Sequence, residues 1–275
     1  MRRAGEVLVK NQIKAVLRAI APKRYDALMA TRINRHGQKV MAKQGIPAIT
    51  SAFVQRYGFT VLGGPFAGMV YITESAGSSF LPKLVGSYEC ELYGVLEQIL
   101  ASSYDTVADV GSAEGYYVVG LAMRMQTTPK IYAFDINHEA RELCRSLAKK
   151  NKVEQKIIIA GFCDAAMLQK TLQGHSLVIC DCEGYETELL QPSTVPALAT
   201  SDILVELHDI LKPGITQVIT DRFRQSHNIL MLDSVERDPA DYPAIHFLPP
   251  EQQRAAVSEF RNGPQQWAFM TPRNK

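Results

Sequence analysis

Short apolar segments alternate with helical segments from about residue 105 onward. Five apolar runs come first, at residues 106–110, 131–135, 156–161, 176–181 and 202–207. Their apolar residues are continuous rather than interleaved with polar ones, which predicts strands buried on both faces, as in a parallel sheet. Because helical segments separate the runs, we expect right-handed crossovers and a doubly wound α/β fold. Two later runs, 228–235 and 266–272, with a predicted helix at 250–262 between them, bring the sheet to seven strands.

The first 80 residues follow a different pattern. Residues 1–43 carry eleven basic and two acidic side chains, and their apolar positions recur at helical spacing, which predicts amphipathic helices. Two β-rich runs within residues 58–73 predict a hairpin, and apolar positions within 81–101 predict one helix with a single buried face. We therefore expect a basic helical cap with a hairpin over residues 1–80 and an α/β domain over 81–275.

The basic segment 1–43 allows two interpretations. It is either a solvated helical cap or a surface for peripheral contact with an anionic partner, such as membrane lipid, nucleic acid or a phosphorylated carrier. Its basic residues are hardly interleaved with aromatic ones, which argues against single-stranded nucleic acid. We therefore do not expect nucleic acid to be the main partner, and the sequence leaves the oligomeric state open.

Composition and targeting signals narrow the class of protein. Hydrophobic residues make up 46% and charged residues 21% of the 275 residues, and no apolar stretch approaches the roughly 18 residues of a membrane-spanning helix. Lys10 and Lys14 interrupt the apolar residues near the N-terminus, so we expect no secretory signal. Five cysteines without a CxxC pair indicate reduced thiols rather than a disulfide framework. These features predict a cytoplasmic protein.

A carboxylate stands near the C-terminal end of each of the first five predicted strands. These residues are Asp109, Asp135, Asp164, Asp181 and Glu206. Ligands of open α/β sheets bind at this edge, where the strand order reverses. Five carboxylates in succession therefore predict a polar ligand along the sheet edge. The alternative is that they are ordinary caps of the helices that follow.

The segment DVGSAEG, residues 109–115, joins the first of these strands to a predicted helix. Glycine lets the backbone approach a ligand closely, and exposed amides at a helix N-terminus favour a carboxylate or phosphate. The dinucleotide fingerprint G-x-G-x-x-G fails here at two of its three positions. The pattern G-x-G-x-G matches Gly111, Ala113 and Gly115 with a single conservative replacement. The loop therefore favours a nucleotide-type cofactor over nicotinamide or flavin.

Three segments together carry a family resemblance. DVGSAEG (109–115), AFD (133–135) and CDCEGYE (180–186) resemble class I S-adenosylmethionine-dependent methyltransferases, and within them the FkbM-like group, in which a VExH-like strand follows, here VELH (205–208). The resemblance covers roughly residues 85–210 and implies a Rossmann-like methyltransferase fold with S-adenosylmethionine as cofactor. The chain departs from the group at Asp135, where FkbM-type proteins more often have glutamate, and the shorter side chain reduces the reach.

The resemblance implies cofactor-binding roles for eight residues, namely Glu89, Asp109, Gly111, Ser112, Gly115, Asp135, Asp164 and Asp181. Gly111, Ser112 and Gly115 would wrap the methionine portion. Asp135 would accept hydrogen bonds from both ribose hydroxyls, because a carboxylate offers acceptors to two vicinal donors. Asp164 would contact the adenine amine.

Glu89, ahead of the first strand, would by the same resemblance close over the cofactor. Asp181 lies at the end of the fourth strand, which the expected strand order places next to the first strand, so it should face the methyl group that is transferred. Asp181 and Glu183 are expected on one strand face, with Cys180 and Cys182 on the other, packed in the core.

His208 is the first candidate for a general base. It follows the fifth strand with acids on either side, and the ordinary pKa of histidine, about 6.5, lies near neutral pH. Asp181 and Glu183 are second candidates for the base. The alternative for His208 is a structural histidine that caps the turn.

We predict no metal site. Cys180 and Cys182 with a histidine would need convergent ligands, which a C-x-C on a buried strand does not offer. A hard-cation site that uses Asp181 and Asp209 remains an alternative.

The predicted function is transfer of a methyl group from S-adenosylmethionine to a hydroxyl oxygen. The resemblance implies a sugar, glycan or small natural product as the acceptor. Alternatives are methylation of nitrogen or of a carboxylate, an RNA-binding or RNA-modifying protein that docks through the basic N-terminal helices, and a fold that binds the cofactor without catalysis.

Overall fold

The computed structural model describes residues 44–261 and 263–273. The described residues from Ile49 onward form one compact unit. The predictions for the basic segment 1–43 lie outside the described residues, so the division of the chain at residue 80 stays a prediction. Among the described residues, no helix is long and apolar enough to cross a membrane.

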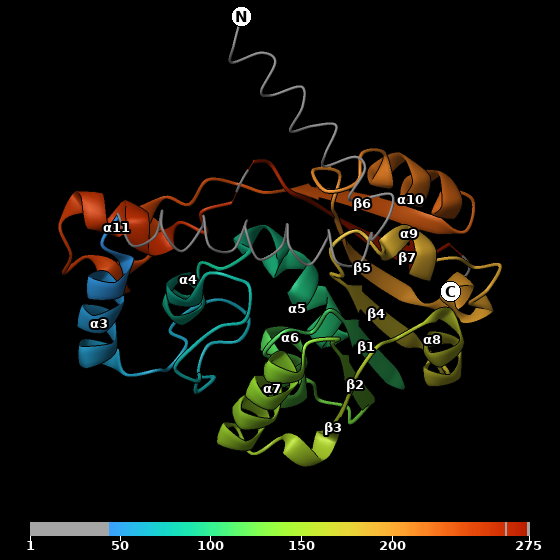
Figure 1. Cartoon of the computed structure of the whole chain (residues 1–275), viewed down its shortest axis with the longest axis horizontal. Coiled ribbons are helices and arrows are strands. Elements are labelled where there is room, and N and C mark those ends of the chain that lie inside the picture. Colours follow the sequence, from blue (N-terminus) through green and yellow to red (C-terminus); the bar gives the residue numbers. More distant parts are fainter. Residues whose placement is uncertain (1–43, 262, 274–275) are drawn as a thin grey trace, which may run out of the picture. The chain divides into compact units, whose positions relative to one another are not determined.

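Strands and helices alternate along the described chain (Figure 1). The strands are β1 (Thr106–Val110), β2 (Lys130–Phe134), β3 (Ile157–Ala160), β4 (Ser176–Cys180), β5 (Asp202–Leu207), β6 (His227–Asp233) and β7 (Gln266–Pro272). The helices are α3 (Ile46–Tyr57), α4 (Phe80–Val85), α5 (Tyr93–Ala101), α6 (Tyr116–Arg124), α7 (His138–Lys150), α8 (Ala165–Thr171), α9 (Glu186–Leu189), α10 (Ile215–Phe223) and α11 (Pro250–Val257).

All seven strands form one sheet in the order β3-β2-β1-β4-β5-β7-β6. Strands β1 to β5 pair in parallel, and β7 runs antiparallel between β5 and β6. The order reverses between β1 and β4, which is where ligands of open α/β sheets bind. The predicted seven-stranded, mostly parallel, doubly wound fold is confirmed.

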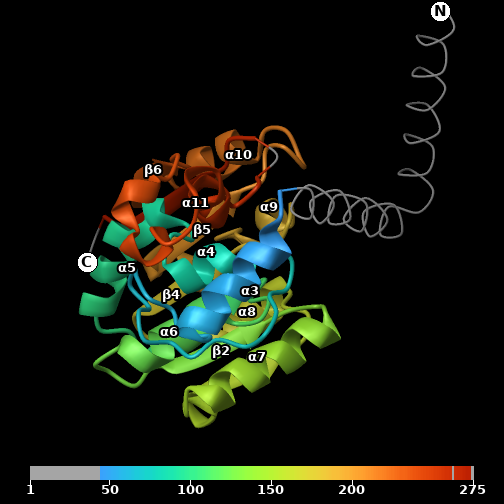
Figure 2. The same cartoon turned by 90° about the vertical axis from the view of Figure 1, so that its left-hand side faces the viewer.

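Helices cover both faces of the sheet. Leu168 of α8, Leu189 of α9 and Phe223 of α10 belong to one buried cluster with Val178 and Val205 of the sheet. Helices α6 and α7 pack against each other, α6 contacts β2, and α7 contacts β3. Figure 1 shows this pair on the opposite side of the sheet from α8, and Figure 2 shows α7 beside α6 and β2. The burial of strands on both faces explains their continuous apolar runs.

The predicted helix over 81–101 is wrong as a single element. Helices α4 and α5 are separated by Gly86 and Glu89, which have positive φ angles of 85° and 47°. A Cβ at Gly86 would lie 2.3 Å from the Cα of Gly63. A close tertiary approach therefore requires glycine at this position and ends α4 there.

Two other predicted elements are shorter than expected. The hairpin within 58–73 is reduced to one isolated antiparallel bridge between Thr60 and Val70. The Val61 and Tyr71 amides still donate across it, at 2.9 and 2.6 Å, whereas the Leu62 amide donates to the Leu84 carbonyl oxygen at 2.9 Å. Helix α11 ends at Val257 rather than at 262.

Candidate active site

The loop between β1 and α6 lies at the reversal of strand order. Gly111 has φ +89° and Gly115 has φ +91°, a region that glycine adopts without the steric cost of a Cβ. The Gly111 and Ser112 amides donate to the Phe134 carbonyl oxygen at 2.9 and 3.1 Å. A Cβ at Gly111 would lie 1.6 Å from the backbone oxygen of Asp181. Glycine at 111 therefore allows the loop to lie against the end of β4.

Two buried polar atoms of this segment lack a partner. Among the described residues, Asp109 Oδ2 and Ser112 Oγ accept and donate no hydrogen bond, although the residues are only 1% and 6% exposed. Burial raises the pKa of Asp109 well above its ordinary value, and the Asp181 and Asp135 carboxylates raise it further. An unsatisfied buried polar group costs about 1–3 kcal/mol, so these two atoms mark a place where a ligand would supply partners.

The Asp135 carboxylate joins this loop to the end of β2. Its Oδ2 accepts from the Ala113 amide (2.9 Å) and its Oδ1 accepts from the Asn137 amide (2.7 Å). An ionised carboxylate has about four acceptor positions, so each oxygen retains capacity for a hydroxyl donor. Asp135 is half-buried.

Asp164 lies after β3 at the same edge. Its Oδ1 accepts from the Met167 amide at 2.8 Å and caps α8. The capping alternative is therefore correct for this oxygen of Asp164. The residue is exposed, so capping does not close it off from a ligand.

Two exposed apolar side chains flank these carboxylates. Ile136 is 78% exposed and Phe162 is 59% exposed. The Phe162 ring lies 5.7 Å from the Tyr185 ring, measured between centroids. The sequence interpretation missed both residues. Neither residue stands out in the sequence, because single exposed apolar side chains are common on protein surfaces.

A histidine and four carboxylates meet where β4 and β5 end. His208 Nε2 lies 3.4 Å from Asp181 Oδ1, 3.5 Å from Glu206 Oε2 and 3.7 Å from Glu183 Oε2. On the other side of the ring, His208 Nδ1 lies 2.7 Å from Glu186 Oε1. The sequence predicted Asp181, Glu183, Glu206 and His208 at this edge, and the structure brings them together.

The pKa values within this cluster are displaced from their ordinary range. Burial lowers the pKa of His208, but the hydrogen bond to Glu186 and the charges of Asp181 and Glu186 outweigh it and bring the pKa to about 9. Burial raises the pKa of Asp181, and the His208 charge opposes this. Without another cation, His208 keeps its proton at neutral pH, so it accepts a proton only after losing one.

The residues that follow β4 leave the strand. β4 ends at Cys180, and Glu183 has φ +55°, so the predicted alternation of faces does not extend through 183. Cys180 is buried, Cys182 is half-buried, and their Sγ atoms lie 3.4 Å apart. The Glu183 side chain is 77% exposed, at the rim of the cluster.

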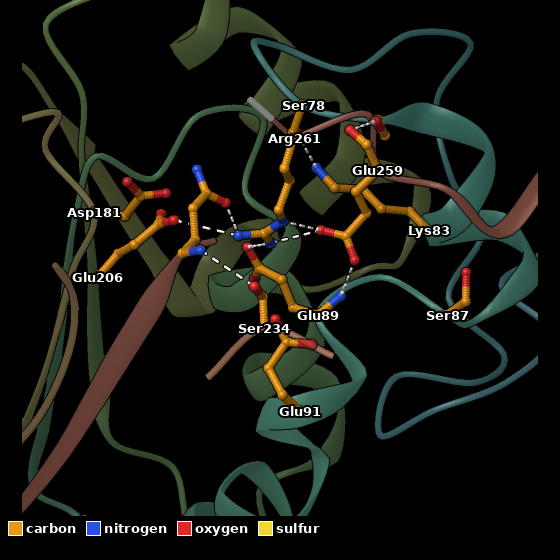
Figure 3. Close-up of polar contacts among 12 residues, drawn as sticks. Ser78, Lys83, Ser87, Glu89, Glu91, Asp181, Glu206, Ser234, Glu259 and Arg261 are labelled. Carbon is orange, nitrogen blue, oxygen red and sulfur yellow. Dashed lines mark hydrogen bonds and ion pairs between the residues drawn. The ribbon is translucent and has the colours of Figure 1, made fainter. Parts of the chain in front are cut away.

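Glu89 lies on the far side of the site, and Arg261 links it to β5 (Figure 3). Arg261 Nη2 donates to Glu89 Oε1 at 2.7 Å, and Arg261 Nη1 lies 3.4 Å from Glu206 Oε1. Glu89 also accepts from the Tyr117 hydroxyl, and Glu259 Oε2 pairs with Arg261 at 2.6 Å. Figure 3 shows the Arg261 guanidinium reaching between Glu206 and Glu259. The sequence interpretation missed Arg261 and Glu259.

A buried ion pair anchors the middle of the glycine loop. Lys83 Nζ contacts Glu114 Oε1, with side-chain exposures of 3% and 0%. Glu114 also accepts from the Tyr71 hydroxyl (2.5 Å) and the Ser75 hydroxyl (2.6 Å). Burial raises the pKa of Glu114, but the charge and hydrogen bond of Lys83 outweigh it and lower the pKa below its ordinary value. The ion pair and hydrogen bonds of Glu114 therefore fix the position of the loop.

The predicted hard-cation alternative with Asp209 does not match the geometry. Asp209 Oδ1 accepts from the Gly214 amide (2.8 Å) and Oδ2 accepts from the Thr216 amide (3.0 Å), which places its carboxylate at the start of α10. The described donor atoms that come together with Asp181 belong instead to Glu206 and His208.

Three solved structures of methyltransferases are similar to this chain. An rRNA methylase from Streptococcus thermophilus has 11% identity and a TM-score of 0.45, over 67% of this chain and 98% of its own. Precorrin-6y C5,15-methyltransferase from Geobacter metallireducens has 11% identity and a TM-score of 0.45, over 66% and 87%. An O-methyltransferase from Bacillus cereus, in complex with SAH, has 10% identity and a TM-score of 0.42, over 66% and 80%. No protein-family model and no curated protein matches the chain.

Proposed function

We propose that this chain is an S-adenosylmethionine-dependent methyltransferase, of the FkbM-like group, that methylates a hydroxyl oxygen. The observation that carries the proposal is the pair of buried, unpartnered atoms Asp109 Oδ2 and Ser112 Oγ. Both belong to the glycine loop at the reversal of strand order. A ligand with hydrogen-bond donors and acceptors would satisfy them at this position.

The residues around the loop suit the parts of the cofactor. Asp109 and Ser112 would bind the polar groups of its methionine portion, and Asp135 would accept from the ribose hydroxyls. Ile136 and Phe162, both exposed, offer apolar faces for the adenine ring. An aromatic or apolar face beside a base contributes through stacking.

The acids of the site suit a cationic reactant. Asp109, Asp181 and Glu206 are 1% exposed, half-buried and 5% exposed, and burial raises the pKa of each. A cation bound beside them would stabilise their ionised forms. When bound, S-adenosylmethionine supplies a methyl group on a positively charged sulfonium. The protein's own contribution is to hold this group in line with the acceptor oxygen and to exclude water.

The acceptor hydroxyl must lose its proton. Asp181, Glu183 and His208, the three candidates from the sequence, lie within one cluster, and we propose that the proton leaves into this cluster. The acceptor is a sugar, a glycan or another small hydroxylated compound. Methylation of nitrogen or of a carboxylate stays an alternative, because neither depends on this proton transfer. Docking of RNA through residues 1–43 also stays an alternative.

Calorimetric titration of the full chain with S-adenosylmethionine and with NAD tests the proposal. We expect binding of S-adenosylmethionine alone. Asp135→Ala should weaken it at least about 10-fold, because a hydrogen bond to a charged group contributes about 1.5–3 kcal/mol. The matched control Asp221→Ala removes an exposed carboxylate of α10 and should bind as the unaltered chain does. Absence of S-adenosylmethionine binding to the unaltered chain would refute the proposal.

A further inference from the structure

His208 has a buried side chain, and its Nε2 makes only long ion-pair contacts, with Asp181, Glu206 and Glu183 at 3.4 to 3.7 Å. The side chain is 6% exposed, and among the described residues Nε2 takes part in no hydrogen bond. Its nearest carboxylate oxygens, on Asp181 and Glu206, lie 3.4 and 3.5 Å away. Charge-assisted N–H···O bonds are about 2.7–2.9 Å long. Asp181 and Glu206 share a side-chain hydrogen bond with each other, so a cation bound between them would replace the shared proton.

Their spacing suits the coordination sphere of a metal ion. Ligand atoms at about 2.1 Å from a tetrahedral metal lie about 3.4 Å from one another. One donor atom each from Asp181, Glu206 and His208 lie within 4.8 Å of one another, and the two separations from Nε2 match this edge length. Once a divalent cation displaces the protons of this group, two carboxylates and a neutral imidazole carry two negative charges, which the cation balances.

The other ring nitrogen is fixed as a metal-binding histidine requires. His208 Nδ1 hydrogen-bonds to Glu186 Oε1 at 2.7 Å, and Glu186 is 0% exposed. The same oxygen accepts from the Cys182 and Gly184 amides at 3.3 and 3.2 Å. A carboxylate on the second nitrogen orients the ring and leaves Nε2 with its lone pair directed to a metal. Arg261 faces Glu206 Oε1, which leaves Oε2 for the cation.

We propose that Asp181, Glu206 and His208 form a binding site for one divalent first-row transition-metal ion, with Glu186 as the residue that positions His208. Carboxylates alone would suit Mg²⁺ or Ca²⁺, whereas an imidazole among them favours a transition metal such as Zn²⁺ or Fe²⁺; Mn²⁺, which accepts carboxylate ligands, serves as the paramagnetic probe. No metal site was predicted from the sequence, because the candidate ligand pairs considered there were Cys180 with Cys182 and Asp181 with Asp209. The site stands on this geometry and does not depend on methyl transfer.

The site also bears on the proposed reaction. A divalent cation next to an acceptor hydroxyl lowers the pKa of that hydroxyl. Glu183, the exposed carboxylate of the cluster that lies outside the ligand set, would take the proton. The acceptor oxygen then forms its bond to the methyl carbon as the bond from that carbon to the sulfonium sulfur breaks.

Titration of the full chain with Mn²⁺, followed by loss of the electron paramagnetic resonance signal of free Mn²⁺, tests the proposal. We expect one bound ion per chain. Asp181→Asn should weaken binding at least about 10-fold, since even second-shell changes cost 10- to 100-fold. The matched control Glu188→Gln removes a carboxylate of α9 that pairs with Lys212 and should leave Mn²⁺ affinity unchanged. Equal affinity in Asp181→Asn and the unaltered chain, or no binding, would overturn the proposal.

A second measurement uses the unaltered chain alone. Pulsed electron paramagnetic resonance of bound Mn²⁺ should show coupling to the ¹⁴N nucleus of an imidazole ligand, and bound Mn²⁺ without this coupling would exclude His208 as a ligand. Titration with S-adenosylmethionine in the absence of metal keeps the two proposals separate. Cofactor binding without Mn²⁺ binding would refute the metal site alone, and the reverse result would refute the proposed function alone.

Discussion

Replacing Gly111 with alanine would place a methyl group against the end of β4. The added Cβ would lie 1.6 Å from the backbone oxygen of Asp181 and 2.6 Å from its carbonyl carbon. Both atoms are backbone, so no side-chain rotation relieves the overlap. The φ of +89° adds a second penalty, because an L residue with a Cβ seldom adopts it.

The size of the effect follows from these two contributions. A left-handed backbone conformation costs an ordinary residue about 1–2 kcal/mol, and overpacking of a filled site costs about 1–3 kcal/mol. Gly111→Ala should therefore lower the free energy of unfolding by roughly 2–5 kcal/mol. For a unit of this size, each kcal/mol of lost stability lowers the melting temperature by about 2–4 °C, so the expected fall is roughly 4–20 °C.

Thermal unfolding, followed by circular dichroism, measures this fall. The matched control is Gly94→Ala in α5, where nothing lies within 4 Å of the added Cβ. Alanine in a helix is favoured over glycine by up to about 1 kcal/mol, so the control should be as stable as the unaltered chain or more so. A Gly111→Ala variant that melts with the control would refute the close approach of the loop and β4.

Glu114→Gln should lower the free energy of unfolding in urea by about 3–5 kcal/mol at pH 7, because Lys83 would stay buried without its carboxylate. The folded pKa of Glu114 is lowered, so its contribution is present above the ordinary value of about 4.3 and is lost as the pH falls through the folded pKa. The stability gap between Glu114→Gln and the unaltered chain should therefore narrow on acidification, and a constant gap would contradict this assignment. Phe162→Ala should weaken S-adenosylmethionine binding by about 1–3 kcal/mol in calorimetry, as base stacking is lost, with no change in melting temperature because the ring is 59% exposed. Unchanged affinity would remove Phe162 from the proposed adenine site.

The strands of the sheet could be predicted from the sequence, because a strand that is buried on both faces is a continuous run of apolar residues. The predicted runs 106–110, 202–207 and 266–272 coincide with β1, β5 and β7. The break between α4 and α5 could not be predicted from the sequence. It depends on the approach of Gly86 to Gly63, a tertiary contact that the periodicity of apolar residues within 81–101 does not encode.

The residues of the candidate site likewise include some that could be predicted from the sequence and some that could not. Parallel strands end at one edge, so Asp181, Glu206 and His208 could be placed together from strand order alone. The pairing of Arg261 with Glu89 spans 172 residues, and Arg261 follows the last helix in a segment without a recognisable pattern. Ile136 was missed for another reason, since an exposed apolar residue carries no signal until its surroundings are known.

A crystal structure of the full chain with S-adenosylhomocysteine, the product left after methyl transfer, tests the central claim most directly. We expect its amino acid portion to supply partners to Asp109 Oδ2 and Ser112 Oγ, its ribose hydroxyls to lie on the Asp135 carboxylate, and its adenine to lie against Ile136 and Phe162. A ligand bound elsewhere, with Asp109 Oδ2 and Ser112 Oγ still without partners, would contradict the account.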